Sequence, residues 1–286
     1  MMKFKRLSST LLLGLLVAGC SASQDYSFKG VGDGIIGGRA VTSTDPVRFS
    51  TVSLMEKGYP NTTPFLSFCT GTLISKNLVV TAAHCVASRA GSDIFVGFGE
   101  SIPFKGDDHL MVKAERFYFH PKFKVVTIQG PEQSYSTSYN DVALIKLSKD
   151  APEGFIPAPI LEDSDQLRVG TSLLAAGIGV TDDEEFTSAK SMNRVEVTYA
   201  GADGEFLISD QRNNKGICYG DSGGPAYLET SHGLVVVGAT HASRGGVMHC
   251  HETADFTSLS KHKDFISAAV DVLQGKAPLF IKLEAL

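Results

Sequence analysis

The sequence lacks basic clusters after its first six residues, and beyond residue 20 it has no apolar run of the roughly 18 residues that a transmembrane helix needs. A nucleic-acid surface needs clustered Lys and Arg, and the formal net charge here is −5. We therefore expect no nucleic-acid binding and no membrane-spanning helix in the mature chain. With 43% hydrophobic and 20% charged residues among 286, the composition is that of a globular protein.

The first 20 residues have the pattern of an export signal. Residues 1–6 are basic and residues 11–18 are apolar but too short for a permanent span, so we predict a signal peptide over 1–19, with a buried N-terminal helix as the alternative. Residues 17–20, Val-Ala-Gly-Cys, resemble a bacterial lipobox, which is cut before a cysteine that carries diacylglycerol. The resemblance implies a bacterial lipoprotein held at a membrane through Cys20. The alternative is a plain secretory signal, with Cys20 removed or left as a free thiol.

Five cysteines are an odd number, which needs an explanation in an exported protein, and lipidation of Cys20 supplies one. The other four can then pair in an oxidising compartment. They are Cys69, Cys85, Cys218 and Cys250.

The rest of the chain has the pattern of a β protein. Residues 20–34 are rich in Ser and Gly and are expected to form a linker or pro-segment. From Ile35 onward, short apolar or alternating runs are separated by Gly, Pro, Asn and Asp, which favours an all-β sandwich or barrel over strand–helix alternation. The predicted strands include 47–54, 71–74, 78–81, 94–98, 142–147, 172–176, 194–199 and 234–239.

Three further segments complete the predicted organisation. Residues 118–139 have the composition of a long polar loop, and residues 151–159, with three prolines, that of a connector between two halves. One helix is predicted near the end, with Gly275 terminating it. Its apolar residues at helical spacing are Phe265, Ile266, Ala269, Val270 and Leu273.

Three separate motifs carry side chains suited to nucleophilic catalysis. Ser222 lies among glycines, which allow close substrate approach and leave backbone N–H groups for an oxyanion. Such a serine is a candidate nucleophile only with a base nearby, and a plain turn is the alternative. His84 is the candidate base, although a histidine beside a strand is usually structural. Asp141 starts an apolar strand, where an unpaired carboxylate is costly to bury, so the His84 ring N–H is a suitable partner.

Four motifs occur in the order found in chymotrypsin/trypsin-type serine endopeptidases, which this sequence resembles from residue 35 to about residue 274. The order histidine, aspartate, serine differs from that of subtilisins and α/β-hydrolases. The motifs are residues 35–38 (Ile-Ile-Gly-Gly), 81–85 (Thr-Ala-Ala-His-Cys), 140–144 (Asn-Asp-Val-Ala-Leu) and 220–225 (Gly-Asp-Ser-Gly-Gly-Pro).

The resemblance implies an all-β fold of two antiparallel six-stranded β-barrels, with the active site in the cleft between them, and a C-terminal α-helix. The protease domain would cover residues 35–286, with one barrel at about 35–150 and the second barrel and helix at about 160–274. Ser222 would attack the scissile carbonyl, and His84 would carry its proton to the leaving amine. Asp141 would orient the ring. Backbone N–H groups of Gly220 and Ser222 would form the oxyanion hole.

The resemblance also assigns the cysteines. It implies one disulfide between Cys69 and Cys85 and another between Cys218 and Cys250. His249 and His251 flank Cys250 and suggest a metal cluster, but a disulfide would remove its thiolate. We therefore expect neither a metal nor a cofactor.

Family activation would require a cut before Ile35, whose new ammonium group would pair with Asp221. Gly34 stands where self-activating trypsin-like zymogens carry Lys or Arg. We therefore expect another protease to make the cut, and the cut to release the enzyme from a Cys20 anchor.

The specificity positions depart from trypsin. Gly216 occupies the pocket floor where trypsin has aspartate, and Ile217 beside it is apolar. These residues favour a small or medium uncharged P1 side chain, although Glu252 and Asp255 leave a basic preference open. His241 could contact Asp141 or attract an acidic substrate, and a structural role is the preferred interpretation. The remaining candidate substrate-binding residues are Tyr219, Ser243 and Ala254.

The predicted function is therefore an exported serine endopeptidase, made as a zymogen. Its partners would be protein or peptide substrates, an activating protease and, before activation, a membrane. We expect a monomer at the bacterial cell envelope, in the outer membrane or periplasm, or released outside the cell after cleavage. The alternatives are a catalytically silent binding protein with a protease fold and an esterase.

Overall fold

The computed structural model describes residues 35–58, 65–103, 107–129, 134–182, 187–188, 191–231, 233–244 and 250–283, without the side chains of 134, 135, 182, 187, 188 and 244. The predicted signal peptide, the linker or pro-segment and Cys20 lie outside the described residues, as do Gly34 and His249. In this described part, none of the helices combines the length and the apolar character of a bilayer span.

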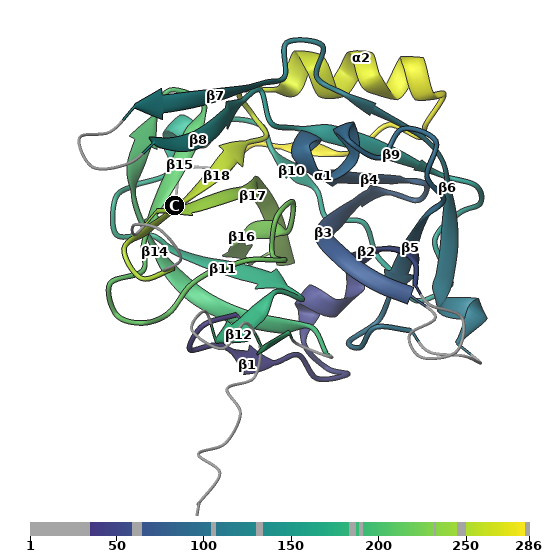
Figure 1. Ribbon diagram of the computed structural model, residues 1–286, viewed down its shortest axis with the longest axis horizontal. Coiled ribbons are helices and arrows are strands. Elements are labelled where there is room, and N and C mark those ends of the chain that lie inside the picture. Colours follow the sequence, from purple (N-terminus) through teal and green to yellow (C-terminus); the bar gives the residue numbers. More distant parts are fainter. Residues whose placement is uncertain are drawn as a thin grey trace, which may run out of the picture. The chain divides into compact units, whose positions relative to one another are not determined.

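The first barrel is a closed antiparallel sheet in the order β2-β3-β4-β9-β6-β5 (Figure 1). Branched and aromatic residues, which favour strands, dominate β4 and β5. Buried side chains such as Leu54, Leu73, Val79 and Val96 form its core. The strands are β2 (Thr51–Lys57), β3 (Phe65–Ser75), β4 (Leu78–Thr81), β5 (Ile94–Phe98), β6 (Met111–Phe119) and β9 (Ala143–Leu147).

The second barrel is a ring in the order β16-β11-β14-β15-β18-β17, closed because β16 also pairs with β17. On β14 the buried Val195 and Val197 alternate with the exposed Glu196 and Thr198, as expected for a strand with one core face. The strands are β11 (Ser172–Gly177), β14 (Asn193–Asp203), β15 (Phe206–Asp210), β16 (Pro225–Thr230), β17 (Gly233–Arg244) and β18 (Thr253–Ser258). The two barrels confirm the predicted fold class.

Shorter elements surround the barrels. β10 and β19 extend the second sheet in parallel beyond β17, β1 pairs with β14, and β7–β8 and β12–β13 are separate hairpins. Their bounds are β1 (Arg39–Ala40), β7 (Lys124–Gln129), β8 (Ser134–Tyr139), β10 (Ile160–Leu161), β12 (Val180–Asp182), β13 (Thr187–Ser188), β19 (Phe280–Ile281), η1 (Pro46–Phe49), η2 (Asp108–Leu110), η3 (Ser164–Gln166), α1 (Ala83–Ala87) and α2 (Lys263–Leu273).

A shared core joins the two barrels. Val80 and Leu144 from the first barrel, Ala176 and Tyr227 from the second, and the apolar face of α2 belong to one buried cluster. The fully buried Tyr227 hydroxyl lies 2.7 Å from Ser50 Oγ and 3.0 Å from Thr51 Oγ1. Burial raises the pKa of Tyr227 to about 12, so this contact is a neutral hydrogen bond between the barrels.

The predicted C-terminal helix is confirmed as α2, and all five of its predicted apolar residues are buried. Its end differs from expectation, because Gln274 and not Gly275 takes the left-handed conformation, with φ 52°. Gly275 serves a different purpose. A Cβ there would lie 2.5 Å from Leu78 Cδ1, so the glycine lets the chain pass close to β4.

The prediction of a loop over residues 118–139 is wrong. Residues 118 and 119 finish β6, and β7 and β8 then form an antiparallel hairpin with Lys124 opposite Tyr139. The hairpin has no deeply buried face on β7, where Val125 is 62% exposed. Val126 and Ile128 are half-buried and alternate with polar residues, but β8 contains only Ser, Thr and Tyr, so the hairpin as a whole gives a weak apolar signal for strands.

Candidate active site

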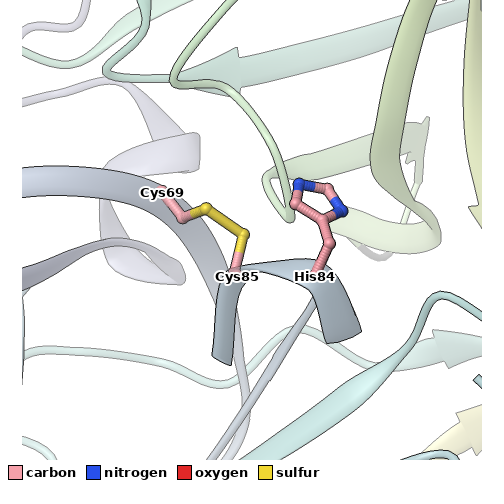
Figure 2. Close-up of side chains that lie close together, drawn as sticks. All are labelled: Cys69, His84 and Cys85. Carbon is pink, nitrogen blue, oxygen red and sulfur yellow. A yellow bond between two sulfur atoms is a disulfide. The ribbon is translucent and has the colours of Figure 1, made fainter. Parts of the chain in front are cut away.

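His84 lies on α1, directly after β4. Ala82 and Ala83 are fully buried, and their small side chains allow the helix to begin where the strand ends. The disulfide between Cys69 on β3 and Cys85 on α1 ties this turn to the barrel (Figure 2). The side chain of His84 is 34% exposed, so it is held in place but remains accessible.

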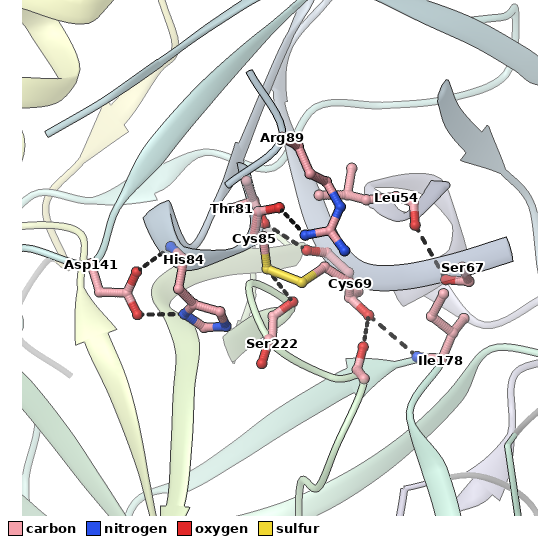
Figure 3. Close-up of a disulfide and its surroundings, with 12 residues drawn as sticks. Leu54, Ser67, Cys69, Thr81, His84, Cys85, Arg89, Asp141, Ile178 and Ser222 are labelled. Atoms are coloured by element: carbon pink, nitrogen blue, oxygen red, sulfur yellow. Dashed lines mark hydrogen bonds and ion pairs between the residues drawn. A yellow bond between two sulfur atoms is a disulfide. The ribbon is translucent and has the colours of Figure 1, made fainter. Parts of the chain in front are cut away.

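Asp141 orients the His84 ring from the segment just before β9. Its Oδ1 accepts the backbone N–H of His84 at 2.8 Å, and its Oδ2 lies 2.7 Å from His84 Nδ1 (Figure 3). A carboxylate accepts only, so Nδ1 carries the proton and Nε2 keeps its lone pair. Burial raises the pKa of Asp141, but the hydrogen bond from His84 and the histidines nearby outweigh it and hold that pKa below its usual value.

A second histidine approaches Asp141 from the other side. His241 on β17 has its Nε2 2.8 Å from Ser138 Oγ, and the Ser138 hydroxyl donates to Asp141 Oδ2 at 3.0 Å. The hydroxyl has one proton, so when it goes to Asp141 the contact with His241 needs a proton on Nε2, whereas the Ser138 backbone N–H, 3.4 Å from Nε2, is accepted only by an unprotonated Nε2. The direction of the contact between Ser138 and His241 therefore depends on the His241 tautomer. The predicted contact of His241 with Asp141 is thus mostly indirect, with 3.7 Å between Nε2 and Oδ2.

The backbone around Asp141 is held by the second barrel. Glu205, in the turn between β14 and β15, accepts the backbone N–H of Asn140. Asn140 has φ 53°, an uncommon conformation that asparagine tolerates better than most residues. Burial and the charge of Asp141 raise the pKa of Glu205, while His262 Nε2 lies 3.8 Å from its carboxylate.

Ser222 lies in a loop anchored to the first barrel next to the His84 turn. Its carbonyl accepts the backbone N–H of Thr70 at 2.9 Å, and the Cys85 sulfur is 3.6 Å from the same oxygen (Figure 3). Gly220 and Gly223 have φ 93° and 77°, and a Cβ on Gly223 would lie 2.0 Å from Thr81 Oγ1. The loop therefore depends on glycine at these positions.

The predicted activation residues are both buried. The Asp221 carboxylate accepts the backbone N–H groups of Gly179 and Cys218 at 2.8 and 2.9 Å, and burial raises its pKa to about 7. Ile35 is fully buried with φ 55°, a strained conformation for a β-branched residue. Ile36 forms an antiparallel bridge with Gly216, which joins this segment to the loop leading to Ser222.

The predicted pocket residues lie in two segments of the chain that the Cys218–Cys250 disulfide joins. Ile217 and Ala254 are buried in one apolar cluster. Ser243 Oγ lies 3.2 Å from Cys250 Sγ, and Tyr219 is 47% exposed. Sequence reasoning missed Gln211, which is fully buried and bonded to both segments, as well as Ser138 and Glu205. A single polar residue in a strand or turn gives no local signal of such long-range contacts.

Cys69, His84 and Cys85 each bring a potential metal ligand within 4.8 Å of one another (Figure 2). The disulfide occupies both sulfurs, and metals bind thiolates, so this group is not a metal site. Cys250 is likewise bonded to Cys218, which leaves His251 without that thiolate as a second ligand.

Comparison with known proteins adds an independent observation. A family model described as Trypsin matches residues 35–260. Phenoloxidase-activating factor 1 of Holotrichia diomphalia is 28% identical over 289 residues, which cover 86% of this chain and 73% of that protein. Trypsin of Sarcophaga bullata is 34% identical over 55% of this chain and 63% of its own length. Brachyurin of Leptuca pugilator is 26% identical over 63% of this chain and 79% of that protein.

Proposed function

Because the chain belongs to the trypsin family, we propose that it is a serine endopeptidase that cleaves peptide bonds through an acyl-enzyme on Ser222. The observation that carries this proposal is the pair of hydrogen bonds by which Asp141 fixes His84, with the lone pair of Nε2 left free. His84 Nε2 takes the Ser222 hydroxyl proton as Ser222 attacks the carbonyl carbon, and then gives it to the leaving amine. Water repeats the sequence to release the acid.

The oxyanion hole is assigned to the backbone N–H groups of Gly220 and Ser222. Among the described residues, no backbone carbonyl accepts either N–H group. A Cβ on Gly220 would lie 2.8 Å from Gly179 Cα, so the glycine is needed to hold the loop in this conformation. One such donor contributes roughly 3–4 kcal/mol to transition-state stabilisation.

Labelling with a fluorophosphonate probe tests the proposal. The activated protein should react, Ser222→Ala should abolish labelling, and Asp141→Asn should lower kcat about 10⁴-fold because the ring tautomer is lost. Absence of labelling in the activated wild type would instead support the catalytically silent binding protein. Hydrolysis of ester substrates without hydrolysis of protein substrates would support the esterase.

Activation by a cut before Ile35 is part of the proposal. The buried Asp221 carboxylate has two N–H donors and a raised pKa, so it is suited to receive the new ammonium group of Ile35. The cut would also release the strained φ of Ile35. N-terminal sequencing of active enzyme should give Ile35, and residues upstream of it would contradict the zymogen.

Export is proposed from the signal-like residues 1–19 and from the two disulfides, which form in oxidising compartments. The bacterial lipoprotein hypothesis rests on residues 17–20 alone. The relatives named above come from animals and give it no support. Membrane fractionation of the full chain and of Cys20→Ser decides it, because only a lipid anchor makes retention depend on Cys20.

A further inference from the structure

Gln211 connects the two segments that carry the residues of the predicted specificity pocket. It follows β15, and its side chain is fully buried. Its Nε2 donates to the carbonyls of Ile217 at 3.2 Å and Cys250 at 2.8 Å, and its Oε1 accepts the backbone N–H of Ile217 at 2.6 Å. Both amide protons are therefore used, and they tie the segment of Ile217 to that of Cys250.

The position of Gly216 shows what this amide occupies. A Cβ built on Gly216 would lie 2.0 Å from both Cδ and Oε1 of Gln211 and 2.5 Å from its Cγ. The space that a side chain at 216 would enter thus contains the Gln211 carboxamide. A larger residue at position 216 would clash with Gln211. Because Gln211 fills the space next to Gly216, the missing side chain of the glycine does not by itself create a deep pocket.

The Gln211 amide is uncharged, and its three hydrogen bonds are with uncharged backbone groups. Glu252 is exposed, and its carbonyl accepts the backbone N–H of Gln211. Asp255 follows Ala254 on β18, and neighbouring strand residues face opposite sides. Because Ala254 packs in the cluster that contains Ile217, Asp255 faces away from that cluster. The hydrogen bonds described for the Gln211 amide involve neither of these carboxylates.

We propose that Gln211 is the specificity-determining residue of this pocket and restricts P1 to small uncharged side chains such as Ala, Ser and Val. The inference rests on the proposed endopeptidase function and deepens it. Ile217 and Ala254 are also buried and apolar, so little accessible space remains in this region and small apolar P1 groups are favoured. Leu, Phe, Lys and Arg would have to displace an amide held by three hydrogen bonds.

The test compares kcat/KM across a peptide library that varies only P1. The full chain is expressed with residues 30–34 replaced by an enteropeptidase recognition sequence, cut before Ile35, and freed of that protease. Wild type should prefer Ala, Ser or Val over Leu and Phe by at least about tenfold, since one excess methylene can cost that much. Gln211→Ala should raise kcat/KM for Leu or Phe relative to Ala by about tenfold or more. Gln166→Ala, at an exposed glutamine on η3, should change nothing.

Gln211→Asn keeps an amide one methylene shorter and serves if Gln211→Ala does not fold. It should shift the preference toward P1 groups one methylene larger. Preference of the wild type for Lys, Arg, Leu or Phe overturns the inference without any variant. An unchanged P1 profile in a folded variant overturns it as well. If fluorophosphonate labels the enzyme, these failures leave the endopeptidase assignment intact, whereas absence of labelling overturns both.

Discussion

His241 lies 3.7 Å from the Asp141 carboxylate, so the aspartate that orients His84 has a histidine on each side. Ser138 connects this second histidine to Asp141 through two short contacts. Phe206 packs on the His241 ring, with 4.8 Å between centroids, and holds it in place. His241 can therefore act on catalysis mainly through the Ser138 hydroxyl.

This arrangement predicts non-additive effects of two substitutions. Ser138→Ala removes one hydrogen bond to Asp141, and a lost hydrogen bond of about 1–1.5 kcal/mol corresponds to roughly a tenfold fall in kcat. His241→Ala alone should cost a similar factor, but in the Ser138→Ala background it should cost little more. A double-mutant cycle on kcat measures this, with Ser136→Ala on the exposed hairpin as control. Additive losses would show that His241 acts independently of Ser138.

The raised pKa of Asp221 predicts that the uncleaved chain loses stability as the pH rises. Burial raises this pKa to about 7 from 3.8, so between these values the folded state binds more protons than the unfolded state. The contribution of Asp221 is fully present below about pH 4 and decreases toward pH 7 by about 1.4 kcal/mol per pH unit.

Urea unfolding of the uncleaved chain at several pH values checks this prediction. Asp221→Asn should remove the decrease, since the amide does not titrate. Asp165→Asn, at an exposed carboxylate, is the matched control. Parallel pH profiles of the wild type and Asp221→Asn would contradict the assignment.

The lowered pKa of His262 predicts the opposite pH dependence, a loss of stability as the pH falls. Burial and the charge of His120 lower this pKa to about 4 from 6.5, with Asp141 opposing them. Between these values the unfolded state binds more protons, so stability is lost as the pH falls from about 6.5 to 4, again by about 1.4 kcal/mol per pH unit. His262→Gln should be less sensitive to acid than the wild type in urea unfolding, and His109→Gln, at an exposed histidine, should not differ from the wild type.

The sequence predicts those parts of the fold whose signal is local. Strands 78–81 and 94–98 have the predicted bounds because their apolar runs are buried in the first barrel. The hairpin of β7 and β8 was missed because it packs little apolar surface. Ser138 and Gln211 were missed for another reason. Their partners lie on other segments of the chain, and a buried polar residue with distant partners resembles any other polar residue in the sequence.

The hydrogen bonds of the buried Tyr227 hydroxyl predict that one substitution lowers both the stability of the fold and kcat. This hydroxyl contacts Ser50 and Thr51 across the barrels, and removing a buried hydrogen-bonding partner costs about 1–3 kcal/mol. Tyr227→Phe should therefore lower the free energy of urea unfolding by that amount. It should also lower kcat, because His84 and Ser222 come from different barrels.

Tyr118→Phe is the matched control. Tyr118 stacks on Phe265 at 6.0 Å, and a phenylalanine there keeps the ring contact. If Tyr227→Phe unfolds like this control, the hydroxyl contacts do not hold the barrels together. If it is less stable but has the wild-type kcat, the alignment of His84 with Ser222 depends instead on the bond from Thr70 to the Ser222 carbonyl.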